Sequence, residues 1–390
     1  MNFTEEQLGK DFHLPKVELV TKNIPLVTKT GQINYKVKLS DNLYKIDRLM
    51  VYINNVPTHS FNGVDLKGKA SNSLEYEVTS ELMVGKNKVS LSCINEKGVE
   101  SMVENFEVIR ENSSGGKANL YVISIGVSEY QDNRYNLKYA AKDANDVVNN
   151  FVQTKELYAN IYTKTLINNE VTKDNINALK EFLKGTTVDD VVIVFVAGHG
   201  LLDEKLDYYF ASHDVNFDNP SAAGIPYEEI ESLFNNIKAI KKILFMDTCH
   251  SGELDKDEVQ SKNNTPLEKG DVSFRAVGEG VELKNPFGVE NSIQLTQSLF
   301  GNLKKGTGTT VISSAGGAEF ALESDTWKNG LFTYCLLNGL SLQMADGDFN
   351  KQIFVSELQK YVAQEVKTLS KGKQQPTARE QNLDLDFRLK

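Results

Sequence analysis

The sequence predicts an α/β protein in two parts: a small all-β sandwich, then a mainly parallel sheet with helices on both faces. Three observations carry this prediction. Short stretches of alternating apolar and polar residues fill 16–110. From 119 to 390, continuous apolar runs alternate with helical patterns. Between the two parts, 111–118 is rich in Ser and Gly and has the composition of a flexible linker.

The first part consists of short predicted strands separated by turn-rich segments. Apolar residues at every second position are typical of strands with one buried face. Several such strands at short intervals favour an immunoglobulin-like sandwich. Residues 1–15 are polar and acidic, without the features of a secretory signal, and are expected to be a leader. The alternating runs are 35–39, 49–53, 74–78, 89–93 and 106–108.

The second part alternates strands and helices. Helical spacing relates Leu137, Ala141, Ala144, Val148 and Phe151, and again Ile176, Leu179 and Leu183. Pro226 is expected to open a helix that carries Ile230, Leu233 and Ile237. Two further helices are expected in NGLFTYCLLNGL and FVSELQKYVAQEV. The continuous apolar runs, which predict strands covered on both faces, are 120–127, 191–197, 242–246 and 310–315. Such alternation predicts a mainly parallel sheet with its functional site at the carboxyl ends of the strands.

Composition limits the partners and the compartment. The net charge of −10 argues against nucleic acid or an anionic membrane and suits a cationic substrate. No run approaches the roughly 18–20 apolar residues of a membrane span. The three cysteines, Cys93, Cys249 and Cys335, do not suggest a disulfide framework, so we expect a cytoplasmic protein. Cys93 and Cys335 are expected to be ordinary core residues.

Two predicted strands run directly into reactive residues. The run 191–197 leads to Gly198-His199-Gly200, and 242–246 leads to the segment DTCHSG, which contains Cys249. A thiol attacks a peptide carbonyl well when an imidazole takes its proton or lowers its pKa. Adjacent parallel strands would place the two groups at one edge of the sheet. The pattern therefore predicts His199 as base and Cys249 as nucleophile.

Glycines flank His199, and Gly252 lies three residues after Cys249; they would let a substrate backbone approach closely. They also leave the amides of Gly200 and Cys249 to bind the oxyanion of the tetrahedral intermediate. His250 and His213 are weaker alternatives for the base. A zinc site is disfavoured because no second Cys lies at ligand spacing.

These paired motifs resemble the caspase and metacaspase superfamily. The resemblance extends over 119–390 through YVISIGVSEY, LKYAAKDANDV, SSAGGAEFALE and NGLFTYCLLNGL. It implies a caspase-like cysteine endopeptidase with a large part, 119–252, a linker, 253–309, and a small part, 310–390. The N-terminal sandwich resembles the immunoglobulin-like module of bacterial caspase-like proteins.

The resemblance also suggests which bond is cut. Caspases specific for aspartate typically show QACRG around the thiol, whereas DTCHSG is similar to metacaspase-like enzymes. In those relatives the equivalents of Asp247 and Asp143 line the primary pocket. Two carboxylates would favour Arg over Lys because the planar guanidinium can engage both. Ser313 and Trp327 are further candidates for the groove wall, and either could instead be a packing residue.

The segment 253–309 is long, polar and charged, which indicates a functional loop or disorder. In the superfamily this linker is often cut by the enzyme itself, and Arg275 is the best internal target. An uncut loop is the alternative. The resemblance implies that the enzyme requires no cofactor, and it leaves activation by Ca²⁺ open. The acidic residues of this linker lack the spacing of an EF-hand loop.

The leading hypothesis is an endopeptidase acting on a protein or peptide substrate in defence, stress or cell death. We expect a monomer with an activating protein or ligand whose identity the sequence leaves open. The alternative is a caspase-fold scaffold or binding module whose chemistry is incidental. Inactive relatives usually lose the His or the Cys, and this chain keeps both.

Overall fold

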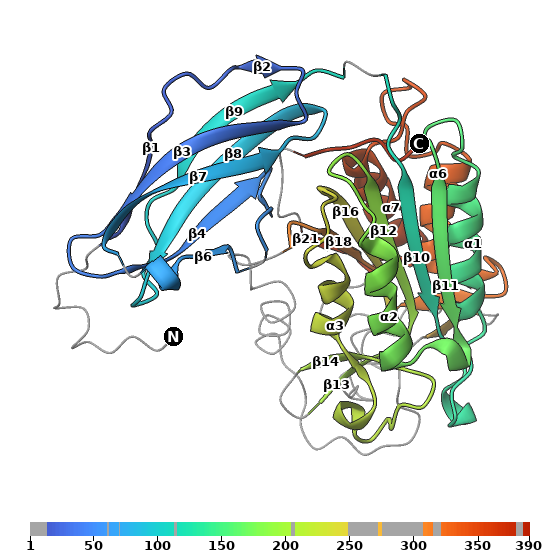
Figure 1. Ribbon diagram of the computed structural model, residues 1–390. Helices are drawn as coiled ribbons and strands as arrows, with labels where there is room; N and C mark the ends of the chain where they lie inside the picture. Colours follow the sequence, from blue (N-terminus) through green and yellow to red (C-terminus); the bar gives the residue numbers. More distant parts are fainter. Residues whose placement is uncertain are drawn as a thin grey trace. The chain divides into compact units, whose positions relative to one another are not determined.

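The chain forms two compact units, 1–116 and 117–390 (Figure 1). In the part of the chain that the structure describes, no helix is long and apolar enough to cross a membrane. The computed structural model describes 14–60, 62–69, 71–112, 115–203, 207–248, 272–274 (backbone only), 307–314, 321–379 and 385–390.

The first unit is all-β and largely antiparallel. Side chains of β3 alternate between buried and exposed, with Val37 and Leu39 fully buried, because each strand has one face on the core. This confirms the predicted alternation, whereas the immunoglobulin-like assignment stays a prediction. One sheet has the order β1 (Lys16–Leu19), β3 (Gln32–Ser40), β7 (Ser73–Glu81). The other has the order β2 (Val27–Thr28), β9 (Glu104–Arg110), β8 (Gly85–Asn95), β4 (Ile46–Ile53), β5 (Val56–Pro57), with β6 (Val64–Asp65) also paired to β4.

The second unit is built on a six-stranded, mainly parallel sheet, as predicted. The last strand of the order pairs antiparallel, and the other pairs are parallel. β11 was not predicted, because it is an edge strand in which polar residues interrupt the apolar run. The order is β11 (Ile161–Ile167), β10 (Leu120–Gly126), β12 (Val191–Gly198), β16 (Lys241–Thr248), β18 (Thr310–Ser313), β21 (Thr377–Arg379).

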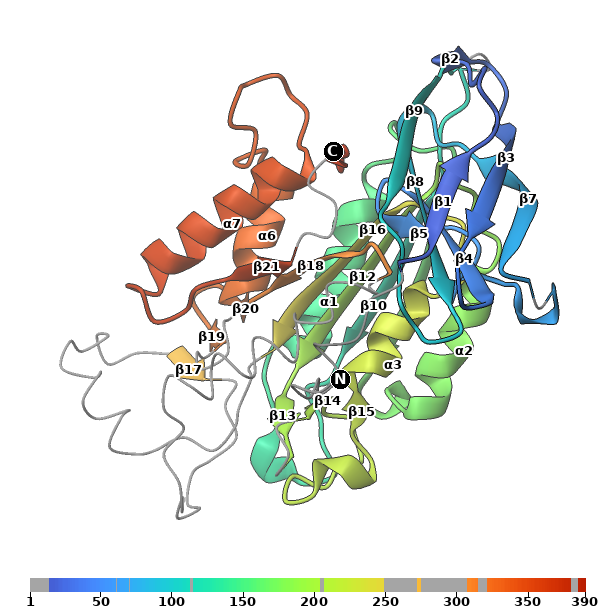
Figure 2. The same cartoon turned by 90° about the vertical axis from the view of Figure 1, so that its left-hand side faces the viewer.

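Helices cover both faces of this sheet (Figures 1 and 2). Successive residues of β10 enter different cores: Leu120 packs with the first group of helices and Tyr121 with the second. This two-sided burial explains why the strands are apolar throughout. The first group is α1 (Ala140–Val152), α6 (Leu331–Ser341) and α7 (Val355–Leu369), and the second is α2 (Lys173–Leu183) and α3 (Tyr227–Glu231).

Two helix predictions need correction. The helix expected from Pro226 to Ile237 is shorter: Pro226 belongs to β15 (Ile225–Pro226), and the helix α3 passes into a single 3-10 turn, Ser232–Phe234. Asn236 then adopts a φ of 58°, a left-handed conformation that ends a helix and that Asn tolerates.

The buried face of α1 also differs from the prediction. Ala140, Val147 and the carboxylate-bearing Asp143 are buried in place of Leu137, Ala141 and Val148, which are only partly buried. The cause is a close approach of α1 to β10. A Cβ atom on Gly126 would lie 2.4 Å from the oxygen of Ala140, so the small residues of α1 must face the strand.

Candidate active site at the carboxyl ends of the parallel strands

The two strands that lead to the reactive motifs are direct neighbours. β12 and β16 pair in parallel, and Gly198 at the end of β12 lies opposite Thr248 at the end of β16 (Figure 2). His199 follows Gly198 and is only 2% exposed. Cys249 follows Thr248 in the sequence and lies outside the described residues. The two motifs therefore start from paired positions at one edge of the sheet.

Gly198 is required where β12 ends. Its φ is 153°, and a Cβ atom at this position would lie 3.0 Å from the Phe210 ring and 3.1 Å from the hydroxyl of Tyr130. Both contacts are tighter than ordinary van der Waals packing. The glycine thus lets the chain pass close to Tyr130 immediately before His199.

The imidazole of His199 has a defined orientation. Its Nε2 atom lies 2.9 Å from the main-chain oxygen of Tyr135, which belongs to the 3-10 turn Asn133–Tyr135. A carbonyl oxygen can only accept, so Nε2 carries the proton of a neutral ring and Nδ1 has the lone pair. The main-chain N–H of His199 donates to the hydroxyl of Tyr130 at 3.1 Å. This arrangement leaves Nδ1 as the atom that can act as a base.

Aromatic rings surround the imidazole. The ring centroids of Tyr130 and Phe217 lie 5.2 and 5.7 Å from that of His199. Phe217 also stacks on Tyr135 at 3.7 Å, with the rings 19° from parallel. These aromatic residues were not predicted, because they lie in loops. No regular spacing in the sequence marks a loop residue as the neighbour of a histidine.

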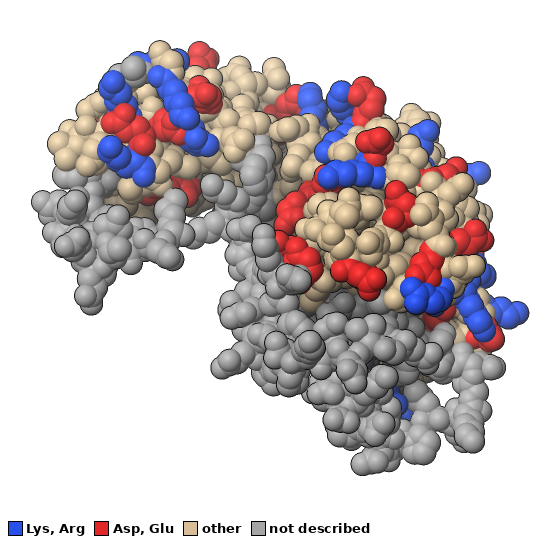
Figure 3. Space-filling model, turned by 90° about the horizontal axis from the view of Figure 1, so that it is seen from below, with Lys and Arg blue, Asp and Glu red and all other residues tan. Residues whose placement is uncertain are grey.

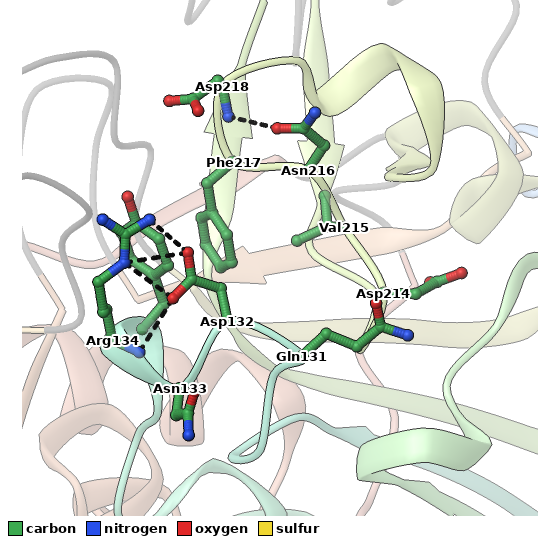
Figure 4. Close-up of a pocket in the computed structure, with 10 residues that line it drawn as sticks. Gln131, Asp132, Asn133, Arg134, Asp214, Val215, Asn216, Phe217 and Asp218 are labelled. Atoms are coloured by element: carbon green, nitrogen blue, oxygen red, sulfur yellow. Dashed lines mark hydrogen bonds and ion pairs between the residues drawn. The ribbon is translucent and has the colours of Figure 1, made fainter.

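A cavity of about 450 Å³ shares Tyr135 and Phe217 with the surroundings of His199. It is lined by two loops, 131–135 and 214–218 (Figure 4). Within it Arg134 donates to Asp132, with Nη2 and Oδ2 2.5 Å apart, and these hydrogen bonds lower the pKa of Asp132. The cavity therefore has a polar wall and is large enough for side chains of a bound peptide.

The two carboxylates predicted to line the primary pocket are fully buried and reach the same helix end. Asp143, in the first turn of α1, accepts from Asn329 Nδ2 at 2.8 Å and from the N–H of Gly330 at 3.0 Å. Asp247, near the end of β16, accepts from Thr333 Oγ1 at 2.5 Å and from the Thr333 N–H at 3.2 Å. The N-terminal end of α6, formed by its first turn and the two residues before it, thus binds both carboxylates, as the positive end of a helix dipole favours.

The other predicted residues are distributed around this edge. Ser313 in β18 is buried and pairs with Met246, the residue before Asp247. Trp327 is half-buried, and its ring lies nearly parallel to that of Tyr334 at 6.4 Å. Gly200 directly follows His199 and begins the short strand β13, Gly200–Leu202. Arg275 and His250 lie outside the described residues, and His213 Nδ1 lies 2.6 Å from the oxygen of Glu129.

Surface charges of both signs are interspersed on the described part of the face shown in Figure 3. The exposed ion pairs of the second unit include Lys138 with Asp325, at 3.1 Å. Exposed pairs of this kind add little stability.

Comparison with known proteins identifies the second unit. A family model described as "Caspase domain" matches residues 121–388. No curated protein matches the chain. Protein GSU0716 from Geobacter sulfurreducens is 15% identical over 67% of this chain and 92% of that one, with a TM-score of 0.45. Fibronectin(III)-like modules of Clostridium thermocellum CbhA are 17% identical over 26% of this chain and 49% of that one, with a TM-score of 0.20.

Proposed function

Because the chain belongs to the caspase domain family, we propose that it is a cysteine endopeptidase with His199 as base and Cys249 as nucleophile. One observation carries the proposal. His199, oriented by the main-chain oxygen of Tyr135, follows Gly198, and Gly198 pairs with the residue that precedes Cys249.

The reaction follows from these positions. Nδ1 of His199 takes the thiol proton, and the sulfur of Cys249 attacks the carbonyl carbon of the substrate. The amides of Gly200 and Cys249 stabilise the oxyanion. The imidazolium then gives its proton to the leaving amine as the peptide bond breaks. Water, deprotonated by His199, hydrolyses the thioester and restores the thiol.

We further propose metacaspase-type specificity for Arg, and less strongly for Lys, at the bond that is cut. Asp143 and Asp247 support this: two buried carboxylates, from α1 and β16, lie against one helix end beside the same sheet edge. A guanidinium bound by both would make charge-assisted hydrogen bonds in a site with little water.

The remaining parts of the hypothesis concern regulation. We propose that the linker 253–309 is cut by the enzyme itself at Arg275, and that the N-terminal unit is an immunoglobulin-like module. A cytoplasmic monomer that needs no cofactor and acts on proteins in defence, stress or cell death fits the intact motifs and the net charge of −10.

The direct test is turnover of fluorogenic peptides that differ only in the residue before the cut. We expect the order Arg, Lys, Asp for wild type, and no turnover for Cys249→Ala or His199→Ala. Cys93→Ser, in the other unit, is the matched control and should retain full activity. Turnover by Cys249→Ala would refute the mechanism, and a preference for Asp would refute the pocket.

Intact mass measurement on the same proteins tests self-cleavage. Fragments that end at Arg275 should form in wild type and be absent in Cys249→Ala. Arg275→Gln should retain peptide turnover and lose these fragments. If both wild type and Arg275→Gln stay uncut while peptides are hydrolysed, the linker is not a substrate, and the peptidase assignment is unaffected.

A further inference from the structure

The loop between α6 and α7 has the residue pattern of a calcium-binding loop. Its twelve residues, DGDFNKQIFVSE, occupy 346–357. Side chains with ligand oxygens stand at positions 1, 3, 5 and 12: Asp346, Asp348, Asn350 and Glu357. The EF-hand pattern requires Asp or Asn at the first three of these positions and Glu at the last. We infer that this loop binds one Ca²⁺ ion.

The three-dimensional structure of the loop supports the pattern independently. Carboxylate oxygens of Asp346, Asp348 and Glu357 lie within 4.8 Å of one another. Calcium–oxygen bonds are about 2.3–2.6 Å long, so two ligands on opposite sides of one ion are at most about 5.2 Å apart. The carboxylate oxygens at positions 1, 3 and 12 are thus as close to one another as ligands of a single ion must be. The Asn350 side chain and the main-chain oxygen of Gln352, at position 7, are the further ligands that the pattern supplies.

The glutamate at position 12 has a fixed place in the helix that follows. α7 begins at Val355, which is position 10 of the pattern. Glu357 lies in its first turn and returns over the loop, with Oε1 accepting from the Gly347 N–H at 3.2 Å and Oε2 from the Phe354 N–H at 3.0 Å. These two hydrogen bonds hold the carboxylate over the loop, where one of its oxygens lies within 4.8 Å of a carboxylate oxygen of Asp346 and of Asp348.

Two positions depart from the pattern: position 9 is Phe354, whose side chain offers no oxygen, and position 6 is not glycine. The EF-hand loop has Gly there for a sharp turn, and this chain has Lys351. Lys351 nevertheless adopts a φ of 64°. The backbone thus keeps the conformation for which the glycine is normally needed, although a lysine favours it less and adds a positive charge beside the carboxylates.

Residues at the end of the chain hold the loop in place. Ile353, at position 8, is fully buried, and its N–H donates to the oxygen of Lys390 at 2.8 Å. The N–H of Leu389 donates to the Ile353 oxygen, also at 2.8 Å. A bound ion would therefore link α7, the loop and the last residues of the chain. It would also stabilise the packing of α7 against α6. The N-terminal end of α6 binds Asp143 and Asp247.

Ca²⁺ fits the loop better than Mg²⁺. Three carboxylates converge on one point, and their mutual repulsion is relieved by a divalent cation. The loop offers oxygen ligands from five residues, as Ca²⁺ accepts, whereas Mg²⁺ demands near-ideal octahedral geometry and retains its waters.

The test is calorimetric titration of the full chain with CaCl₂ after treatment with EDTA, on a Cys249→Ala background to exclude self-cleavage. We expect one ion per chain and a Tm raised by Ca²⁺ more than by Mg²⁺. Loss of a residue that only supports a metal ligand typically weakens metal binding by ~10–100-fold. Glu357→Gln and Asp348→Asn each remove a direct ligand, so each should weaken Ca²⁺ binding by more than that. Asp174→Asn, which removes an exposed carboxylate from α2, is the control and should bind as wild type does.

Lys351→Gly separates ion binding from an effect on folding. It removes the positive charge and supplies the residue that position 6 favours, so it should bind Ca²⁺ several-fold more tightly than wild type. Absence of binding at about 1 mM Ca²⁺, the weak end of the EF-hand range, would overturn the inference. So would equal affinities for Glu357→Gln and Asp174→Asn, or a Lys351→Gly protein whose affinity does not rise. None of these measurements depends on peptidase activity.

Discussion

The Nε2 atom of His199 lies 2.9 Å from the main-chain oxygen of Tyr135, 64 residues earlier in the chain. This contact connects the loop after β10 to the end of β12. It fixes which nitrogen carries the proton, and so which one can take a proton from a thiol. The Tyr135 ring is in turn held by Phe217, which stacks on it at 3.7 Å. The orientation of the imidazole thus depends on two loops outside the sheet.

Replacing Phe217 tests this dependence. Phe217→Ala removes the ring that contacts both Tyr135 and His199, so the imidazole loses its fixed orientation. We expect kcat to fall by about tenfold or more, since a misplacement of ~1 Å can cost about 100-fold. Phe217→Tyr keeps the ring and should retain most of the activity. Steady-state kinetics with an Arg peptide decide the matter: an unchanged kcat with a raised KM would show that the ring serves substrate binding instead.

Thr333 provides a test of the buried carboxylate at the end of β16. Its hydroxyl donates to Asp247 at 2.5 Å, and both side chains are fully buried. Thr333→Val keeps the shape and removes the donor, and should lower the free energy of unfolding by about 1–3 kcal/mol. Thr333→Ser keeps the donor and should lose less. Urea unfolding followed by circular dichroism measures both, and equal stability of Thr333→Val and wild type would contradict the expected role.

Thiol reactivity should distinguish Cys249 from the other two cysteines. Cys93 and Cys335 are fully buried. Burial raises the pKa of Cys93 to about 11 and also raises that of Cys335, so both thiols stay protonated and unreactive at neutral pH. Native wild type should therefore take up one equivalent of iodoacetamide, and Cys249→Ala should take up none. Labelling of Cys249→Ala in the folded state would refute this prediction.

Lys242 should make stability depend on pH. The side chain is 2% exposed, and burial lowers its pKa from 10.5 to about 7, although Glu231 acts in the opposite direction. Between these two values the unfolded chain binds the proton and the folded chain does not. The free energy of unfolding therefore rises with pH from about 7 to about 10.5, by up to roughly 1.4 kcal/mol per pH unit.

The variant Lys242→Met removes this titration. Its stability relative to wild type should be greatest at or below pH 7 and should decline as the pH is raised towards 10.5. Chemical unfolding of both proteins at about pH 6, 7, 8 and 9, which lie below, at and above the folded-state pKa of about 7, gives the difference. A difference in stability that stays constant across these pH values would show that Lys242 keeps its proton in the folded protein.

The sequence by itself was sufficient to predict four of the six strands of the mainly parallel sheet, whereas β11 and β21 were not predicted. Strands covered on both faces must be apolar throughout, so β10, β12, β16 and β18 could be recognised as continuous runs. The reactive motifs follow two of these runs directly, and parallel strands end at the same edge. The pattern of the proposed calcium loop also stands in the sequence, at 346–357, outside the acidic linker 253–309.

The tertiary structure decided the contacts that have no sequence signature. The oxygen of Tyr135 is a main-chain atom that every residue carries, so nothing in the sequence marks it as the partner of His199. The family resemblance implies one pocket for Asp143 and Asp247, and this stays a prediction. Their contacts with Asn329, Gly330 and Thr333 join segments 86 to 187 residues apart. Local patterns determine strands and helices because their hydrogen bonds and burial repeat along the chain. Pairings over such separations are set only when the helices pack on the sheet.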